Sequence, residues 1–379
     1  TGGPSPGCNL AGANGGSGIV ITRMPTSSGL TFTASPGTNT IIASPDGKEV
    51  IANFTVSGTL GVVDKTSASE TNYLVVAGGG GGGSGQNNNV SGGGAGAGGL
   101  RTSFNCGSIP SIFLTAGTYP VTIGASGSGS TTACVNGSDG TDSVFYGITA
   151  NGGGGGGSHR GKQGNSGGSG GGGGTGTGGG PGGGGSGNSP SASSPFQGNG
   201  GGDAINGSSC TAGTFNRAGG GGGGATDVGQ NAHNPSPSAS KGGNGGAGLT
   251  SSITNSCVAY AGGGGGGSNF GSCSRGAGGA GGGGNGGCGL PSGCVSGRTG
   301  KVGTTNTGGG GGGGGYGVSS PSGCVSNGGN GGSGIVVVRV PGSTSAAVAP
   351  GTNSIATLPG PAGGCKVASF TVSGTLTIS

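Results

Sequence analysis

The residues that could bind a metal or form covalent links are few, and ten cysteines are the largest group among them. No two of these cysteines form a CxxC pair, and the two histidines, His159 and His233, stand alone. A zinc site needs closely spaced Cys and His ligands, so no metal or other cofactor is expected. Disulfide bonds are the better interpretation of the cysteines, and they predict an oxidising, extracellular setting.

The order of the cysteines suggests pairs without fixing them, because connectivity cannot be deduced from sequence alone. Three pairs of neighbouring cysteines each bracket a short segment, and two other cysteines lie in the end segments of the chain. The candidate intramolecular pairs are Cys106 with Cys134, Cys257 with Cys273, and Cys288 with Cys294. The candidates for a bond to another copy of the chain are Cys8 and Cys365.

The acidic residues do not form a catalytic pattern. The eight of them are scattered, and neither a nucleophile elbow nor a GK[ST] phosphate loop is present, so the chain is not expected to be an enzyme. Asp139 and Asp142 in SDGTDS could suggest calcium, but a polar turn before a strand explains them more simply. The net charge of +5 forms no basic stripe, and no apolar run reaches a membrane span. Neither nucleic-acid binding nor membrane insertion is therefore expected.

A second group of candidates lies in the loops between glycine runs and carries amide or aromatic side chains. Such groups suit sugars, because a ring stacks on the sugar face and amides bond its hydroxyl groups. The alternative is that these loops are solvated connectors. The candidate binding residues are Gln86, Asn87, Asn88, Asn89, Phe196, Gln197, His233, Tyr260, Asn269 and Phe270.

Glycine dominates the elements that must position these loops, at 117 of 379 residues. Charged residues are 6% and aromatic residues 4% of the chain, which excludes a large ordinary apolar core. A flexible linker is one interpretation, and collagen is another, but glycine does not keep the every-third-residue frame of collagen. The main runs, mostly six to eight residues long, are 78–83, 152–157, 219–224, 262–267 and 308–315, with shorter runs at 170–174, 182–185 and 281–284. Their similar lengths favour a bundle of glycine helices of the polyproline-II type, bonded to one another through the backbone.

The remaining elements are predicted to be β-strands. Short β-branched or aromatic runs between turn residues indicate strands at 19–23, 30–34, 39–43, 50–56, 73–77, 119–123, 143–146 and 335–340. No window has helical periodicity with caps, so almost no α-helix is expected. The predicted fold class is mainly β and irregular, with a polyglycine-II bundle flanked by short strands.

Two passages occur twice at one fixed distance. SGIVITRMP at 17–25 returns as SGIVVVRVP at 333–341, and FTVSGTL at 54–60 returns at 370–376, both 316 positions later (333 − 17 and 370 − 54). Such a period predicts tandem repetition. We therefore expect residues 1–25 to end a preceding repeat, 26–72 to open this one, 73–341 to form the glycine-rich domain, and 342–379 to open a following repeat. Both end segments are expected to pair with a neighbouring copy, because alone they would expose unpaired strand edges.

The order of several sequence blocks resembles the glycine-rich domain of bacteriophage tail-fibre adhesins and related bacterial surface proteins. The blocks are FTVSGTL, YLVVAGGGGGG (73–83), AGGLRTS (97–103), TYPVTIGA (118–125), SVFYGITANGGGGGG (143–157) and GGSGIVVVRV (331–340). The resemblance covers roughly residues 46 to 341 and implies a polyglycine-II sandwich whose tip loops bind a cell-surface receptor. The cysteines and the repeat depart from the pattern of a single tip adhesin.

Three functional hypotheses follow from these patterns. The first is an extracellular repetitive fibre, structural and adhesive, with neighbouring copies of itself as partners. The second is a tail-fibre type adhesin that binds a cell-surface glycan or protein. An ice-binding protein is the weakest, because a regular Thr or Ala ladder is not evident. The expected location is outside the cell, as a secreted protein, a surface appendage or a virion fibre.

Overall fold

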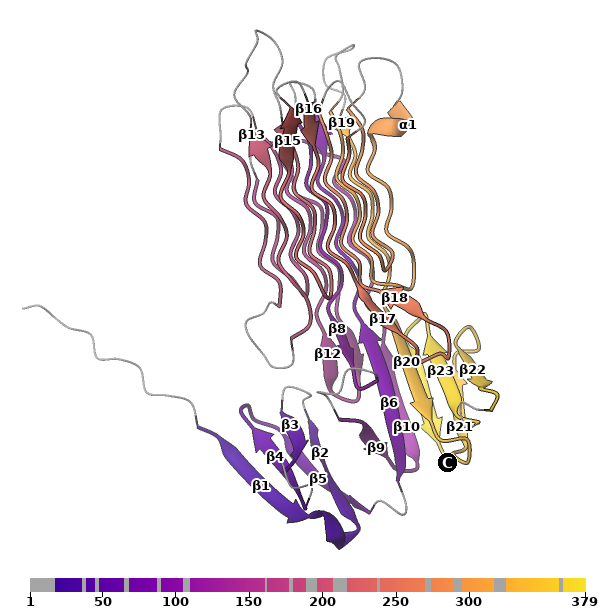
Figure 1. The fold of residues 1–379 in the computed structure, drawn as a ribbon. Coiled ribbons are helices and arrows are strands. Elements are labelled where there is room, and N and C mark those ends of the chain that lie inside the picture. Colours follow the sequence, from indigo (N-terminus) through magenta and orange to yellow (C-terminus); the bar gives the residue numbers. More distant parts are fainter. Residues whose placement is uncertain are drawn as a thin grey trace, which may run out of the picture.

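The computed structural model describes residues 18–35, 39–44, 48–64, 68–86, 90–104, 110–160, 162–176, 180–188, 196–206, 217–236, 239–269, 274–289, 295–316, 325–360 and 364–379. The chain forms three regions (Figure 1). A small β unit holds residues 18–64 and is called the N-terminal unit. A larger set of strands, the base, supports a long bundle of glycine-rich segments, and the far end of that bundle is called the tip.

The N-terminal unit consists of two small antiparallel sheets. β1, β4 and β3 form one sheet in the order β1-β4-β3, and β2 pairs with β5 in the other. Phe32, Val50 and Ala52 are its buried apolar residues. The elements are β1 (Val20–Pro25), the 3-10 helix η1 (Thr26–Ser28), β2 (Leu30–Ser35), β3 (Thr40–Ala43), β4 (Glu49–Phe54) and β5 (Thr59–Asp64). The strands expected in this part of the sequence are thus confirmed.

Two larger sheets and one hairpin form the base. Their strands are β6 (Ser69–Val76), β8 (Leu100–Thr102), β9 (Ile112–Leu114), β10 (Gly117–Thr122), β11 (Ser143–Phe145), β12 (Ile148–Ala150), β17 (Leu249–Ser251), β18 (Val258–Tyr260), β20 (Ile335–Val340), β21 (Ala346–Ala349), β22 (Ser354–Thr357), β23 (Lys366–Phe370) and β24 (Gly374–Ile378). One sheet has the order β22-β23-β20-β6-β8, with β9 also on β6, and the other the order β12-β11-β10-β24-β21. The first core cluster, defined by Tyr73, Val75, Phe145, Phe370 and Leu376 with their neighbours, draws its residues from both sheets.

Between the base and the tip, the glycine-rich segments run side by side without strand or helix assignment (Figure 1). The segment 92–99 shows how they are held together, because its N–H groups donate to three different segments in turn. In order, the bonds are Gly94 to Gly220, Ala95 to Gly311, Gly96 to Gly154, Ala97 to Gly223, Gly98 to Gly308 and Gly99 to Asn151, at 2.8–3.0 Å. The partner segment therefore recurs at every third residue.

The same segment is surrounded by accepted bonds as well. Its carbonyl groups accept from three further segments, 77–83, 169–172 and 264–267. With the acceptors in 151–157, 220–223 and 308–314, segment 92–99 has bonded neighbours on all sides. A Cβ added to Gly94 would fall inside the contact distance of the Gly264 carbonyl, so only glycine permits this spacing. Ordinary side chains would force the segments apart.

Short strand pairs and one helical turn form the tip. They are β7 (Gly85–Gln86), β13 (Ile205–Asn206), β14 (Arg217–Ala218), β15 (His233–Ser236), β16 (Ala239–Lys241), β19 (Val325–Ser326) and the helix α1 (Val295–Arg298). Pairs form between β7 and β19, β13 and β14, and β15 and β16. With a single four-residue α-helix in the described residues, the mainly β and irregular fold class is confirmed. Within the same residues, no helix has the length and apolar character to cross a membrane.

The N-terminal unit repeats the arrangement of β20–β24 in the base. Val20 lies opposite Phe54 in the β1–β4 pair, and Val336 lies opposite Phe370 in the β20–β23 pair, 316 positions later in both strands (336 − 20 and 370 − 54). The other pair agrees too, since Ala34–Leu60 between β2 and β5 corresponds to Val348–Leu376 between β21 and β24. The repeated sequence thus adopts one five-strand module twice.

A buried asparagine marks the same position in both copies. Asn39 accepts the backbone N–H groups of Thr55 and Val56 through its side-chain oxygen, at 3.1 and 3.2 Å. Asn353 accepts those of Thr371 and Val372 at the same two distances. Each asparagine therefore holds the turn between the last two strands of its module.

Residues 342–379, which the sequence predicts to open a following repeat, pack against the strands of their own chain. β23 pairs with β20 and β24 pairs with β10, and Phe370 and Leu376 are fully buried in the first core cluster. In this structure these residues therefore complete the two sheets of the base. Likewise, residues 39–64 pair within the N-terminal unit. The physical reason is that FTVSGTL follows a strand that pairs back onto the GSGIV strand in both copies.

Candidate functional site

The structure separates the predicted binding residues between the two ends of the bundle. Gln86 in β7 and His233 in β15 lie at the tip, and Asn269 lies beside Ser268, which bridges to β14. Gln197 bonds Leu100 of β8, and Tyr260 belongs to β18, so both lie at the base. The candidates therefore do not form one surface. Asn87, Asn88, Asn89 and Phe270 lie outside the described residues.

Burial gives two of the predicted residues a structural role. Gln197 is 1% exposed, and its side-chain oxygen accepts the N–H of Asn151 at 2.9 Å while its amide donates to the Asn151 side chain. Tyr260 packs with Leu74 and Ile253 in a second core cluster, and its burial raises the pKa of the phenol. Neither side chain is available to a ligand in this structure. Among the base residues, Phe196 is exposed, and at the tip His233 is exposed whereas Asn269 is buried.

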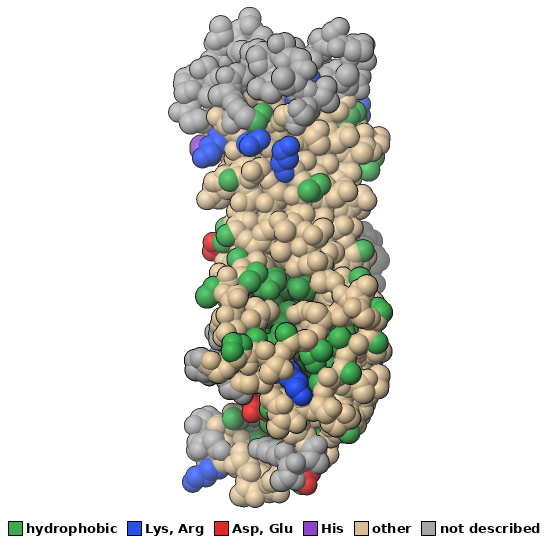
Figure 2. Space-filling view, turned by 90° about the vertical axis from the view of Figure 1, so that its right-hand side faces the viewer, with side chains coloured by type: hydrophobic (Ala, Val, Ile, Leu, Met, Phe, Trp, Pro, Cys, Tyr) green, Lys and Arg blue, Asp and Glu red, His purple; other side chains and the backbone are tan. Residues whose placement is uncertain are grey.

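The tip gathers basic residues that are scattered in the sequence. Figure 2 shows lysine and arginine side chains at that end of the bundle, next to the residues drawn in grey. The elements of the tip and the turns beside them carry Arg160, Lys162, Arg217, Lys241, Arg275 and Arg298. Cations collected on one surface favour anionic ligands. The sequence pattern missed this group, because glycine-rich segments that run to the base and back separate Lys162, Arg217, Lys241, Arg275 and Arg298 along the chain.

Burial and charge determine the protonation of the groups at the tip. His159 is buried, and this burial lowers its pKa, with Arg160 and Arg217 lowering it further. Burial also lowers the pKa of Arg217. Tyr316 has a raised pKa because it is buried, an effect that Arg298 opposes. The positive charge of the tip at neutral pH therefore comes from arginine and lysine rather than from His159.

Two of the three predicted cysteine pairs are not formed in the structure. Cys134, Cys257 and Cys365 are free thiols, so the predicted pairs Cys106–Cys134 and Cys257–Cys273 are not formed. Cys288 is disulfide-bonded, and its partner lies outside the described residues, as do Cys8, Cys106, Cys273 and Cys294. The pair Cys288–Cys294 and the link from Cys8 or Cys365 to another copy remain predictions.

The two aspartates of the SDGTDS sequence act on the backbone of the bundle. Asp139 accepts the N–H of Gly155 at 2.7 Å and the side-chain amide of Asn165 at 2.8 Å, and Asp142 accepts the N–H of Gly152 at 2.8 Å. Their carboxylates thus bond the edge of a glycine segment. In the part of the chain that the structure describes, no group of three or more His, Cys, Asp or Glu residues could hold a metal ion.

A comparison with known protein families gives one result. The model of a family described as a glycine-rich domain matches residues 55–341. The match spans more than half of the chain, from the turn before β5 to the end of β20. Among curated proteins, none matches the chain.

Proposed function

The chain belongs to the glycine-rich domain family, and from this premise we propose that it is an extracellular repetitive fibre protein with a structural and adhesive role. One observation carries the proposal. The same five-strand module occurs twice with the same strand register, its first strands 316 positions apart (336 − 20) and its buried asparagines 314 apart (353 − 39). A module that ends one glycine-rich unit and also stands before it is the arrangement of a tandem array.

In this proposal, the glycine-rich segments are polyglycine-II helices that form a sandwich. The recurrence of each partner segment at every third residue supports this assignment, because such a helix has three residues per turn. Each turn directs one N–H toward each of three neighbours, so the backbone groups are satisfied between helices rather than within them. A rod of this kind needs no large apolar core, which suits the composition of the chain.

The adhesive part of the proposal rests on the tip. Six lysine and arginine residues lie at this end of the bundle, of which Arg160 and Lys162 are exposed and Arg217 and Arg298 are buried. Cell-surface polysaccharides and lipids that carry carboxylate or phosphate groups are the proposed partners, because their negative charge complements the basic residues of the tip. The cysteines favour an oxidising, extracellular location for the fibre.

The second candidate is a receptor-binding adhesin of the tail-fibre type, which presents one tip to a cell-surface glycan or protein. The exposed basic residues at the tip favour this reading as well, since a single tip would suffice for binding. The two candidates differ in the number of glycine-rich units for each particle.

Electron microscopy of the native material, labelled with antibodies to the 379-residue chain, tests the proposal. We expect periodic labelling along a filament, and mass spectrometry of the denatured material should give a mass of several repeats. Labelling confined to the end of a virion fibre would support the tail-fibre adhesin instead. Isolated particles with a single unit and no filament would contradict the fibre.

A further inference from the structure

The two copies of the five-strand module differ in the number of strands bonded to them. In the base, β20 lies between β23 and β6, and β24 lies between β21 and β10. In the N-terminal unit, the counterparts β1 and β5 each have one partner among the described residues, β4 and β2 respectively. The positions that correspond to β6 and β10 are therefore open. The N-terminal unit thus resembles β20–β24 but lacks the two neighbouring strands to which β20 and β24 are bonded in the base.

Exposure of the apolar side chains follows this difference. Ile335, Val336 and Val337 at the start of β20 are 8%, 0% and 0% exposed. Their counterparts Ile19, Val20 and Ile21 are 58%, 60% and 59% exposed, although the residue types are nearly the same. β-branched residues in a row are typical of a strand that is buried on both faces. The sequence of β1 thus fits a central strand, but the strand stands at an edge.

A groove lies where the missing strands would pack. It has a volume of about 680 Å³ and is lined by residues that include Val20, Phe54 and Leu60. The counterparts of these three residues are Val336, Phe370 and Leu376, which all belong to the first core cluster. In that cluster they pack with side chains from β6, β10 and β11, namely Tyr73, Val75, Val121 and Phe145. The groove therefore corresponds to the part of this core that β20–β24 supply, without the part that β6, β10 and β11 supply.

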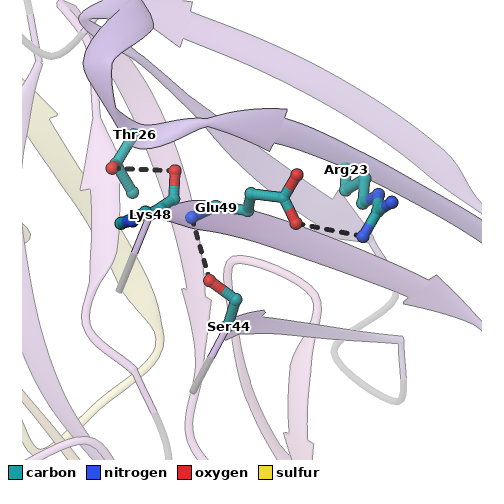
Figure 3. Close-up of polar contacts among 5 residues, drawn as sticks. All are labelled: Arg23, Thr26, Ser44, Lys48 and Glu49. Carbon is teal, nitrogen blue, oxygen red and sulfur yellow. Dashed lines mark hydrogen bonds and ion pairs between the residues drawn. The ribbon is translucent and has the colours of Figure 1, made fainter. Parts of the chain in front are cut away.

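Val20, Phe54 and Leu60 place the groove at one end of β1 and β4. At the other end of β1 and β4, polar contacts join neighbouring strands (Figure 3). Arg23 Nη1 lies 3.1 Å from Glu49 Oε2, the hydroxyl of Thr26 donates to the Lys48 carbonyl at 3.0 Å, and the N–H of Glu49 donates to the Ser44 hydroxyl at 2.9 Å. These contacts suit a surface in water. The groove thus lies away from these polar contacts, and Ile42 and Val62 are exposed apolar residues outside it.

We propose that the N-terminal unit binds the β6-like and β10-like strands of another glycine-rich unit, an inference that rests on the proposed tandem fibre. The register follows from the base: Val336 lies opposite Val75 and Leu376 opposite Tyr119. Val20 and Leu60 would take these places against the incoming strands. Backbone bonds along two strand edges and the filled core would join one unit to the next.

The partner that fits the N-terminal unit is a glycine-rich unit that lacks its own copy of β20–β24. In an intact copy of this chain, β6 and β10 are already paired with β20 and β24, so that copy has no free strands to offer. A glycine-rich unit that stands before β1 in a tandem array has strands of the required type and lacks another module to close it. We therefore assign the site to the preceding unit of the array.

Deletion variants create such an occupant from the chain itself. A variant of residues 1–330 lacks β20–β24, so it presents free β6 and β10 strands and also carries β1–β5. We expect it to form head-to-tail multimers in sedimentation velocity, because each N-terminal unit closes the next copy. A variant of residues 65–330 lacks both modules and should remain a monomer until the intact chain is added, which should give a one-to-one complex.

A charged side chain placed in the groove distinguishes specific binding of the strands from non-specific hydrophobic association. Val20→Glu should weaken the association at least tenfold, because the counterpart Val336 is fully buried whereas Val20 is exposed in the free unit. Val228→Glu is the matched control, since Val228 is an equally exposed valine outside the groove, and it should leave the association unchanged. Equal association of both variants would overturn the proposal.

A second measurement does not require the deletion variants to fold. A peptide of residues 69–83, which contains β6, is titrated into the intact chain and into its Val20→Glu variant. Binding to the intact chain that is at least tenfold weaker in the variant supports the site, and absence of binding together with monomeric 1–330 overturns it. These outcomes are independent of electron microscopy of native material, so the fibre and the docking site can fail separately.

Discussion

The glycine bundle and the base are both held by hydrogen-bonded extended chain, but side chains have opposite roles in them. In the base, buried residues such as Phe145 and Phe370 fill the space between two sheets and select the strand register. In the bundle, the interior holds almost no side chains, and neighbouring segments touch through their backbones. The fold of the base therefore depends on the packing of its side chains, whereas the fold of the bundle depends on the absence of side chains at glycine.

This difference predicts opposite responses to mutation. The base should tolerate apolar residues of similar volume and be weakened by truncation. The bundle should be insensitive to truncation, since nothing can be removed from glycine, and should be weakened by any added atom. The predictions below test the two responses, from the largest expected effect to the smallest.

The largest effect is expected for Gly264→Val in the middle of the bundle. A Cβ at Gly264 would overlap the Gly311 carbonyl, and the other atoms around it are also backbone, so no side chain can move aside. We expect the free energy of unfolding to fall by about 4 kcal/mol or more, measured by chemical denaturation. Gly180→Val is the matched control, because no atom lies within 4 Å of its Cβ position. Equal stability of the two variants would contradict the close backbone packing.

The second prediction concerns truncation in the base. Phe370→Ala should lower the free energy of unfolding by about 3–4 kcal/mol, since Phe370 is fully buried in the first core cluster. Phe54→Ala changes the counterpart in the N-terminal unit, where the side chain is only partly buried, and should cost about half as much. A similar loss at both positions would show that the two copies of the module are buried alike, against the open groove.

The third prediction is an alkaline loss of stability from Tyr73. Burial raises the pKa of Tyr73 to about 12, with Arg101 opposing the shift. Below pH 10, the phenol is neutral in both states; between pH 10 and about 12, the unfolded chain ionises while the folded chain does not. The free energy of unfolding should therefore fall by about 2–3 kcal/mol across this range. Tyr73→Phe should reduce the fall, and an unchanged pH dependence in that variant would assign the effect to other tyrosines.

The smallest effect is expected for the asparagine that recurs in both modules. Asn353→Ala removes the acceptor of two backbone N–H groups, those of Thr371 and Val372, and should cost about 1–2 kcal/mol. Asn39→Ala removes the same contacts in the N-terminal unit, and we expect a similar loss for that unit alone. Hydrogen exchange at the four donor groups measures both losses in one chain. Protection that stays unchanged in either variant would argue against the shared role.

Local sequence patterns predicted the strands of the N-terminal unit and several strands of the base, although not β21–β24. The runs at 19–23, 30–34, 50–56, 73–77 and 335–340 all contain strands, because β-branched residues between turn residues form a local signal. The 316-residue period also indicated that the two ends share a structure, as the matching registers show. These properties need no knowledge of distant contacts.

The grouping of the strands could not be predicted in the same way. FTVSGTL was expected to open a unit, but its strand pairs back onto the preceding GSGIV strand in both copies. A tandem sequence fits either grouping, because the same strands follow one another in both cases. Only the packing of Phe370 and Leu376 against Tyr73 decides between them, and that contact joins residues almost 300 positions apart (370 − 73 = 297).

The candidate binding residues failed for a related reason. The chain reverses at the end of each glycine segment, so the number of preceding reversals decides whether a loop lies at the tip or at the base. Gln86 and His233 come out at the tip, whereas Gln197 and Tyr260 come out at the base and are buried there. The composition of a loop does not indicate how many reversals precede it, so it does not predict at which end of the bundle the loop lies. The same count brings together Arg160, Arg217 and Arg298, which look isolated in the sequence.

The position at which the chain enters and leaves the bundle has a mechanical consequence. β6 leads into the bundle and β20 leads out of it, and Val76 lies opposite Ile335 in this strand pair. Tension along a tandem array would pass between the two strands through the base, leaving the glycine segments unloaded as a side branch. Once the strands separate, residues 77–334 would extend by roughly 850–900 Å of hidden length. The bundle would then act as a stored reserve of chain, released under overload before the covalent backbone breaks.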